Sequence, residues 1–144
     1  MRIPAPGRLQ AVYYAASGAW PLLSYRSFEL VTGRKREPWL VKTVGLLLGV
    51  VAVAVATDPH GATAVTRRVG IGSALALGAV DVWYAGVRRR ISPIYLGDAA
   101  VEAMLIGLWL RRRQEVWAHP GWAARPSPSP RATSVRRRRG SLHP

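Results

Sequence analysis

The chain has 144 residues, and its 21 lysines and arginines outnumber seven acids to give a formal net charge of +14. A nucleic-acid-binding protein of this charge is usually short of apolar residues, whereas this chain is 49% hydrophobic, so charge and apolar residues must lie in different segments. The absence of cysteine excludes disulfides, thiolate metal sites and cysteine nucleophiles.

The first apolar stretch covers residues 9–31 and contains Pro21. We interpret it as a kinked transmembrane helix, because a membrane bundle tolerates an internal proline where neighbouring groups satisfy the freed backbone. The alternative is a secretory signal peptide, with Arg2 and Arg8 as its basic N-terminal region and a run of small residues at 15–19. Two tyrosines inside the apolar run argue against the signal peptide.

Three further apolar stretches cover residues 39–57, 67–88 and 93–111. Each is close to the roughly 20 helical residues that cross a hydrocarbon core. None has the continuous polar stripe of a soluble amphipathic helix. The sequence therefore predicts an all-α fold, a polytopic transmembrane bundle of four helices within residues 1–113.

The composition changes at the C-terminal end, where residues 111–144 hold nine arginines and one acid, a net charge of +8. Residues 114–144 are rich in proline and arginine and cannot bury enough apolar area to fold, so we predict a disordered basic tail. We expect this tail to contact anionic lipid head groups. Nucleic acid is the less economical partner, because the tail's arginine run lacks interleaved aromatic residues and follows a membrane anchor.

The basic residues that flank the predicted helices bear on orientation, since cytoplasmic loops carry an excess of them. With four spans, both termini and the second loop share one side, which has seven flanking basic residues against six on the other. The remaining tail arginines favour cytoplasmic termini. The tryptophans near span ends, Trp39, Trp83 and Trp109, are predicted to form an interfacial belt.

Small residues recur at four-residue spacing in two predicted helices, where they permit the close backbone approach that drives helix association in membranes. They are Gly45 and Gly49 in the second helix and Gly70, Ala74 and Gly78 in the third. The spacing predicts a helix–helix contact within the chain or between two copies. The sequence is compatible with binding to protein partners and with a homo-oligomer.

The candidate site is a cluster of six ionisable residues in or near the predicted spans. They are Arg26, Glu29, Lys42, Asp81, Asp98 and Glu102. Asp98 and Glu102 are four residues apart and share a helical face. At a rise of about 1.5 Å per residue, Asp81 lies at a similar depth across a short loop. We therefore expect three carboxyls to converge in one half of the bilayer.

The cluster has two interpretations, and the sequence leaves both open. In the functional one it lines a polar cavity that serves as a proton relay, a cation or amine site, or a head-group pocket, since ionisable residues inside a membrane mark function by default. In the structural one Glu29 pairs with Lys42, Arg26 pairs with an acid, and the ion pairs set helix register. We expect no catalytic residue, cofactor or metal site, because the histidines lie outside the apolar stretches and no phosphate loop or nucleophile elbow occurs.

Several segments resemble a family of small, uncharacterised bacterial four-helix integral membrane proteins. They are LQAVYYAASGAWPLLSYRSFELVTGRK, PWLVKTVGLLLG, AVDVWYAG and RISPIYLGDAAVEAMLIGLW, and they cover most of residues 9–110. The resemblance implies a multi-pass protein of the bacterial inner membrane and favours a first helix over a signal peptide. In this family the Thr-Gly pair, Thr32-Gly33 here, is usually followed by proline, lysine, threonine and an acid. This chain instead has a more basic loop, Gly33-Arg34-Lys35-Arg36-Glu37.

The resemblance brings no known substrate or activity, so three functions are weighed from the residues. The favoured hypothesis is a structural or accessory membrane component without catalysis. The second is a small transporter or proton-coupled module that uses Asp81, Asp98 and Glu102. The third is a membrane enzyme that acts on lipid or isoprenoid substrates, with a carboxylate as general acid or base.

Overall fold

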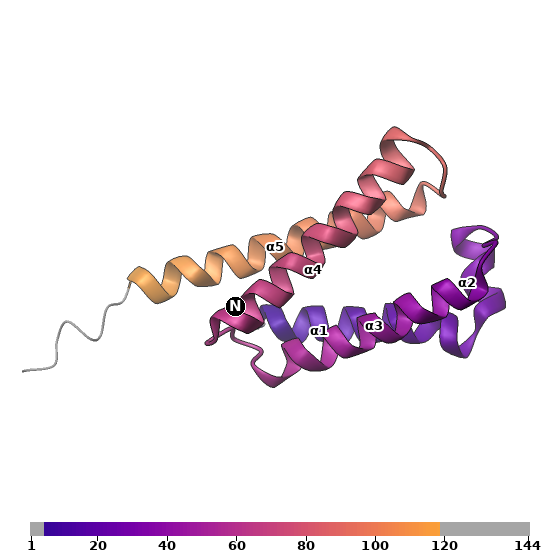
Figure 1. Ribbon diagram of the computed structural model, residues 1–144. Helices are drawn as coiled ribbons and strands as arrows, with labels where there is room; N and C mark the ends of the chain where they lie inside the picture. Colours follow the sequence, from indigo (N-terminus) through magenta and orange to yellow (C-terminus); the bar gives the residue numbers. More distant parts are fainter. Residues whose placement is uncertain (1–4, 119–144) are drawn as a thin grey trace, which may run out of the picture.

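The computed structural model describes the backbone of residues 5–118 and the side chains of residues 5–111. This part of the chain is all-helical, as predicted (Figure 1). Its elements are α1 (Pro6–Leu23), α2 (Tyr25–Thr32), α3 (Pro38–Thr57), α4 (Ala64–Asp81), the π-helix η1 (Val82–Val87) and α5 (Ile94–Ala118). The predicted tail of residues 114–144 lies outside the described residues from residue 119 onward, and residues 114–118 continue α5.

The stretch predicted as one kinked helix over residues 9–31 consists of two helices, α1 and α2, that meet at Ser24. Pro21 lies in the last turn of α1, where its missing amide hydrogen removes one helical hydrogen bond. The bend is held by Trp20, whose Nε1 donates to Ser27 Oγ at 2.9 Å and whose ring packs edge-on against Phe28 at 5.6 Å. The two helices therefore meet in a bend that side chains stabilise.

The helices pack as two antiparallel pairs, α1 with α3 and α4 with α5 (Figure 1). In the first pair Gly18 and Gly45 allow backbone contact, because a Cβ added at Gly45 would lie 2.5 Å from the Gly18 carbonyl oxygen. In the second pair Gly70 lies against the ring of Trp109, and Gly78 lies against Glu102. The small residues at these positions thus make contacts within the chain. Gly49 of the same spacing pattern faces open space.

The two pairs meet at the end where α1 and α4 begin and diverge toward the loops at residues 33–37 and 88–93 (Figure 1). We call these the closed end and the open end. At the closed end the buried side chain of Gln10 donates to Gly70 O at 2.8 Å and Ser73 Oγ at 3.2 Å, and it accepts from Trp109 Nε1 at 2.8 Å. One amide therefore joins three helices.

The loop of the closed end has its own hydrogen bonds. The carboxylate of Asp58 accepts from the backbone amides of Ala62 at 2.9 Å and Thr63 at 2.8 Å. These amides lower the pKa of Asp58 from 3.8 to about 2, because they bind the charged form. The amide of Gly7 donates to Pro59 O at 3.0 Å and ties the start of α1 to this loop.

The prediction of an interfacial tryptophan belt is wrong for Trp109. Trp39 and Trp83 are exposed, whereas Trp109 is fully buried and bonds to Gln10. An indole buried between helices is stabilised when its N–H finds an acceptor, and Gln10 provides one. Trp109 is a core residue of the closed end.

Two helical segments are long and apolar enough to cross a membrane by length and composition, residues Pro38–Thr57 with mean hydropathy 2.2 and Ala64–Val87 with mean hydropathy 1.3. The outer face of α3 carries aliphatic side chains that are 60% to 67% exposed, namely Leu46, Leu47, Val50 and Val53. The interior in contrast includes buried Gln10, Asp81 and Glu102. Apolar side chains therefore face outward while several polar ones are buried.

Candidate functional site

The site forms where α4 and α5 present acids to α1. Asp81 is the last residue of α4 and is 6% exposed. The π-helix η1 follows it directly, and such wide turns are frequent at functional sites. Asp98 and Glu102 lie one turn apart on α5, and Glu102 is 1% exposed. We call Asp81, Asp98 and Glu102 the carboxyl cluster.

Two adjacent tyrosines of α1 donate hydrogen bonds to the carboxyl cluster. The hydroxyl of Tyr13 donates to Asp98 Oδ1, and the hydroxyl of Tyr14 donates to Glu102 Oε2 at 3.0 Å. These bonds join α1 to α5 across the interior. The sequence held a signal for them, since two tyrosines interrupt an otherwise apolar run, but it did not show which residues they meet.

The carboxyl cluster has more polar atoms than partners. Asp81, Asp98 and Glu102 line one cavity, and two carboxyls can hydrogen-bond to each other only by sharing a proton. Within the described part of the chain, Asp81 Oδ2 and Glu102 Oε1 are buried without a hydrogen-bond partner. An unsatisfied buried polar group costs on the order of 1–3 kcal/mol, so both oxygens have capacity for a ligand or a proton.

A cavity of about 740 Å³ separates the two helix pairs, and its polar lining includes the carboxyl cluster with Tyr13 and Tyr14. The remaining walls are mainly apolar. They include Trp20, Pro21, Phe28, Val31, Leu40, Val41, Val44, Leu48, Leu77, Val80, Ile91, Ile94 and Val101. The cavity therefore combines hydrocarbon walls with acids on one side, as ligand pockets with few polar anchors do.

Lys35 stands where this cavity meets the open end. Its ammonium group donates to Thr32 O at 3.1 Å and lies 4.8 Å from the ring centre of Tyr95, one turn before Asp98. Its backbone amide donates to Glu29 Oε1 at 2.9 Å. These contacts hold one positive charge at the entrance, next to the acids of the interior.

The structure brings together three of the six predicted site residues. Arg26 on α2 and Lys42 on α3 are exposed, and neither lines the cavity. Glu29 is half-buried and accepts the amide of Lys35, where the structural interpretation had expected Lys42 as its partner. Among the described residues, no three His, Cys, Asp or Glu side chains are grouped as ligands for a metal ion.

No family model, curated protein or solved structure matches this chain.

Proposed function

We propose that this chain is an integral membrane protein with four spanning segments, formed by α1 with α2, by α3, by α4 with η1, and by α5. Two of these segments have the length and composition of spans. Further support comes from the exposed aliphatic face of α3 and the buried polar residues of the interior. This distribution suits a hydrocarbon solvent, in which polar side chains face the bundle interior.

We assign the protein to the bacterial inner membrane, in line with the family resemblance, with both termini in the cytoplasm. Because α1 and α4 begin at the closed end (Figure 1), the closed end then faces the cytoplasm and the open end faces outward. A reporter enzyme that is active only outside the cytoplasm is expected to be inactive when fused to the C-terminus. Activity of that fusion would reverse the orientation.

The carboxyl cluster is proposed to bind a hydrophobic cation in exchange for a proton, which makes the protein a small transporter or proton-coupled module. The observation that carries this proposal is the pair of unpartnered, buried carboxyl oxygens, on Asp81 and Glu102, at a largely apolar cavity. A hydrophobic cation would place its positive charge against these oxygens, and the apolar walls would cover its hydrocarbon part. When the cation binds, a carboxyl releases its proton, so the net charge of the cavity stays constant.

A structural or accessory role is the second candidate, and one observation favours it. The hydrogen bonds from Tyr13 and Tyr14 to the cluster join α1 to α5 and so stabilise the contact between the helix pairs. A side chain kept only for this contact would not need to be an acid, because an amide oxygen also accepts from a tyrosine hydroxyl, and Glu102 Oε1 is buried without a partner. No feature of the geometry favours the third alternative, a membrane enzyme.

Binding of tetraphenylphosphonium to the purified protein in detergent tests the proposal, with tryptophan fluorescence as readout because Trp20 lines the cavity. We expect Glu102→Gln to weaken binding at least about tenfold, since the amide removes the charge while its oxygen still accepts from Tyr14. If one proton is exchanged, affinity should fall about tenfold per pH unit as the pH decreases.

The matched control is Glu37→Gln, which removes an exposed acid outside the carboxyl cavity and should leave binding unchanged. Equal binding by wild type and Glu102→Gln would reject the cation site. If instead Asp81→Asn and Glu102→Gln both prevent accumulation in membranes, the cluster is architectural.

A further inference from the structure

The two loops of the open end concentrate positive charge around a second hollow. Residues 33–37 and 88–93 contain six basic residues and one acid, Glu37. Between the loops lies a hollow of about 450 Å³, lined from one side by residues 32–37 and from the other by residues 90–92. The structure thus places basic side chains of two distant chain segments around one space.

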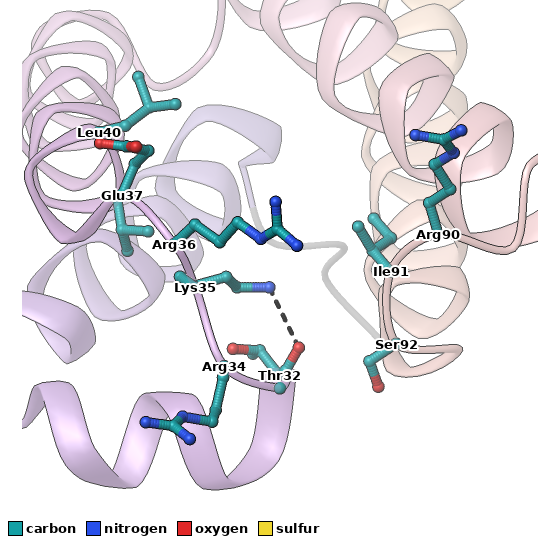
Figure 2. Close-up of a pocket in the computed structure, with 11 residues that line it drawn as sticks. Thr32, Arg34, Lys35, Arg36, Glu37, Leu40, Arg90, Ile91 and Ser92 are labelled. Carbon is teal, nitrogen blue, oxygen red and sulfur yellow. Dashed lines mark hydrogen bonds between the residues drawn. The ribbon is translucent and has the colours of Figure 1, made fainter.

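Figure 2 shows how these side chains lie. Lys35 and Arg36 extend from their loop into the hollow, toward Ile91 on the opposite loop. Arg90 lines the hollow from that loop, and its guanidinium group points away from Lys35 and Arg36. Arg34 and Glu37 point away from it. We call Lys35, Arg36 and Arg90 the basic vestibule.

The guanidinium groups of the vestibule have unused hydrogen-bonding capacity. The backbone amide of Arg90 donates to the carbonyl oxygen of Tyr84 in η1 at 2.8 Å. Within residues 5–111, the guanidinium groups of Arg36 and Arg90 donate to no protein acceptor. Lys35 and Arg36 bring like charges into the hollow while Glu37 points away. Like charges repel one another, and an anion that accepts from both side chains relieves that repulsion.

The vestibule opens directly into the apolar cavity. Five residues line both spaces, namely Thr32, Lys35, Leu40, Val41 and Ile91. A free anion would use only the basic hollow. A molecule with a phosphate and a hydrocarbon chain would use both, with its chain along Leu40, Val41 and Val44.

We infer that the basic vestibule binds the phosphate head group of an anionic lipid whose hydrocarbon chain enters the adjoining cavity. The inference rests on the proposed membrane placement, which puts the loops at head-group level, and it does not depend on cation binding at the carboxyl cluster. It also gives a reason for six basic residues at an end proposed to face outward, where the positive-inside rule disfavours them. A bound phosphate would neutralise the entrance through which the proposed cation reaches the acids.

The test is native mass spectrometry of the full chain released from nonionic detergent, titrated with phosphatidylglycerol or with phosphatidylcholine of the same acyl chains. Wild type is expected to bind phosphatidylglycerol preferentially. The triple variant Lys35→Gln, Arg36→Gln, Arg90→Gln should weaken that binding about 100-fold, because each basic side chain near an anionic lipid contributes about fivefold. If the triple variant fails to fold, Arg36→Gln alone should weaken binding about fivefold.

The matched control removes the same charge from exposed positions of the closed end and α5, with Arg8→Gln, Arg68→Gln and Arg111→Gln. It should change phosphatidylglycerol binding by less than about twofold. Equal losses in the two triple variants would overturn the proposal. So would displacement of the lipid by inorganic phosphate at equal concentration, because the hydrocarbon chain would then contribute nothing. Tetraphenylphosphonium binding to Arg36→Gln, which changes no residue of the carboxyl cavity, reports separately on the carboxyl cluster.

Discussion

At the closed end Gln10 uses its donor and its acceptor to join three helices, and Asp58 is held by two backbone amides. At the open end the carboxyl cluster leaves two buried oxygens without partners, and the basic vestibule has guanidinium groups without acceptors among the described residues. Both ends place polar groups between helices. The buried polar groups of the closed end are satisfied within the protein, whereas two buried oxygens of the carboxyl cluster are not, so we propose an architectural role for the closed end and ligand binding for the open end.

The closed end and the open end also differ in how closely their helices pack. At the closed end Gly70 admits the ring of Trp109 and the side chain of Gln10, and no room remains for a side chain. Toward the open end the helix pairs diverge around the cavity of about 740 Å³. Substitutions at the closed end should therefore change stability, and substitutions at the open end should change binding.

The largest expected effect on stability is that of Gln10→Leu. It leaves the buried indole N–H of Trp109 without its acceptor, which should lower the free energy of unfolding by about 2–3 kcal/mol. Glu102→Gln at the open end should change it by less than about 1 kcal/mol, because Tyr14 keeps an acceptor. Denaturation in mixed micelles measures both. A cost for Glu102→Gln as large as that for Gln10→Leu would remove the distinction between the two ends.

The next effect concerns close packing on α4. Gly70→Ala places a Cβ 2.8 Å from Trp109 Cε2 and 2.9 Å from Gln10 Oε1, so we expect a loss of about 1–2 kcal/mol. Gly72 lies on the same helix and faces open space, which makes Gly72→Ala the matched control. The control should be neutral or stabilising by about 1 kcal/mol. Equal free energies of unfolding for Gly70→Ala and Gly72→Ala would show that the closed end is not tightly packed.

The smallest effect is a pH-dependent one at Asp58. Its pKa falls to about 2 in the folded protein, below the unfolded value, so its contribution to stability is present above about pH 4 and is lost as the pH decreases through about 2. We expect Asp58→Asn to lower the Tm slightly at pH 6 and to have no effect below pH 2. An equal change in Tm at both pH values would show that the charge of Asp58 does not matter.

Some features of the site follow from local periodicity and were therefore accessible from the sequence. Residues four apart share a helical face whatever the helix packs against, so the pairing of Asp98 with Glu102 needs no tertiary information. The depth of Asp81 follows in the same way from helix rise and a short loop. The bend near Pro21 follows from a missing amide hydrogen, although the division into two helices at Ser24 depends on how Trp20 packs.

Other features depend on how each helix is rotated about its axis and on which helix lies beside it. The position of Trp109 near a span end predicted an interfacial residue, but the rotation of α5 buries it against Gly70. The hydrogen bonds of Tyr13 and Tyr14 also depend on helix packing, because their acceptors lie more than 80 residues away in the chain. The basic vestibule joins two loops that only the packing of the helix pairs brings together.

The helical class of the described chain and the residue types on each helix face could be read from the sequence, because both follow from short-range spacing and apolar content. Which polar groups are satisfied and which lack a partner could not be read from it. The physical reason is that satisfaction depends on the distance and direction between groups on different helices, and those are set by packing around Gly18, Gly45 and Gly70.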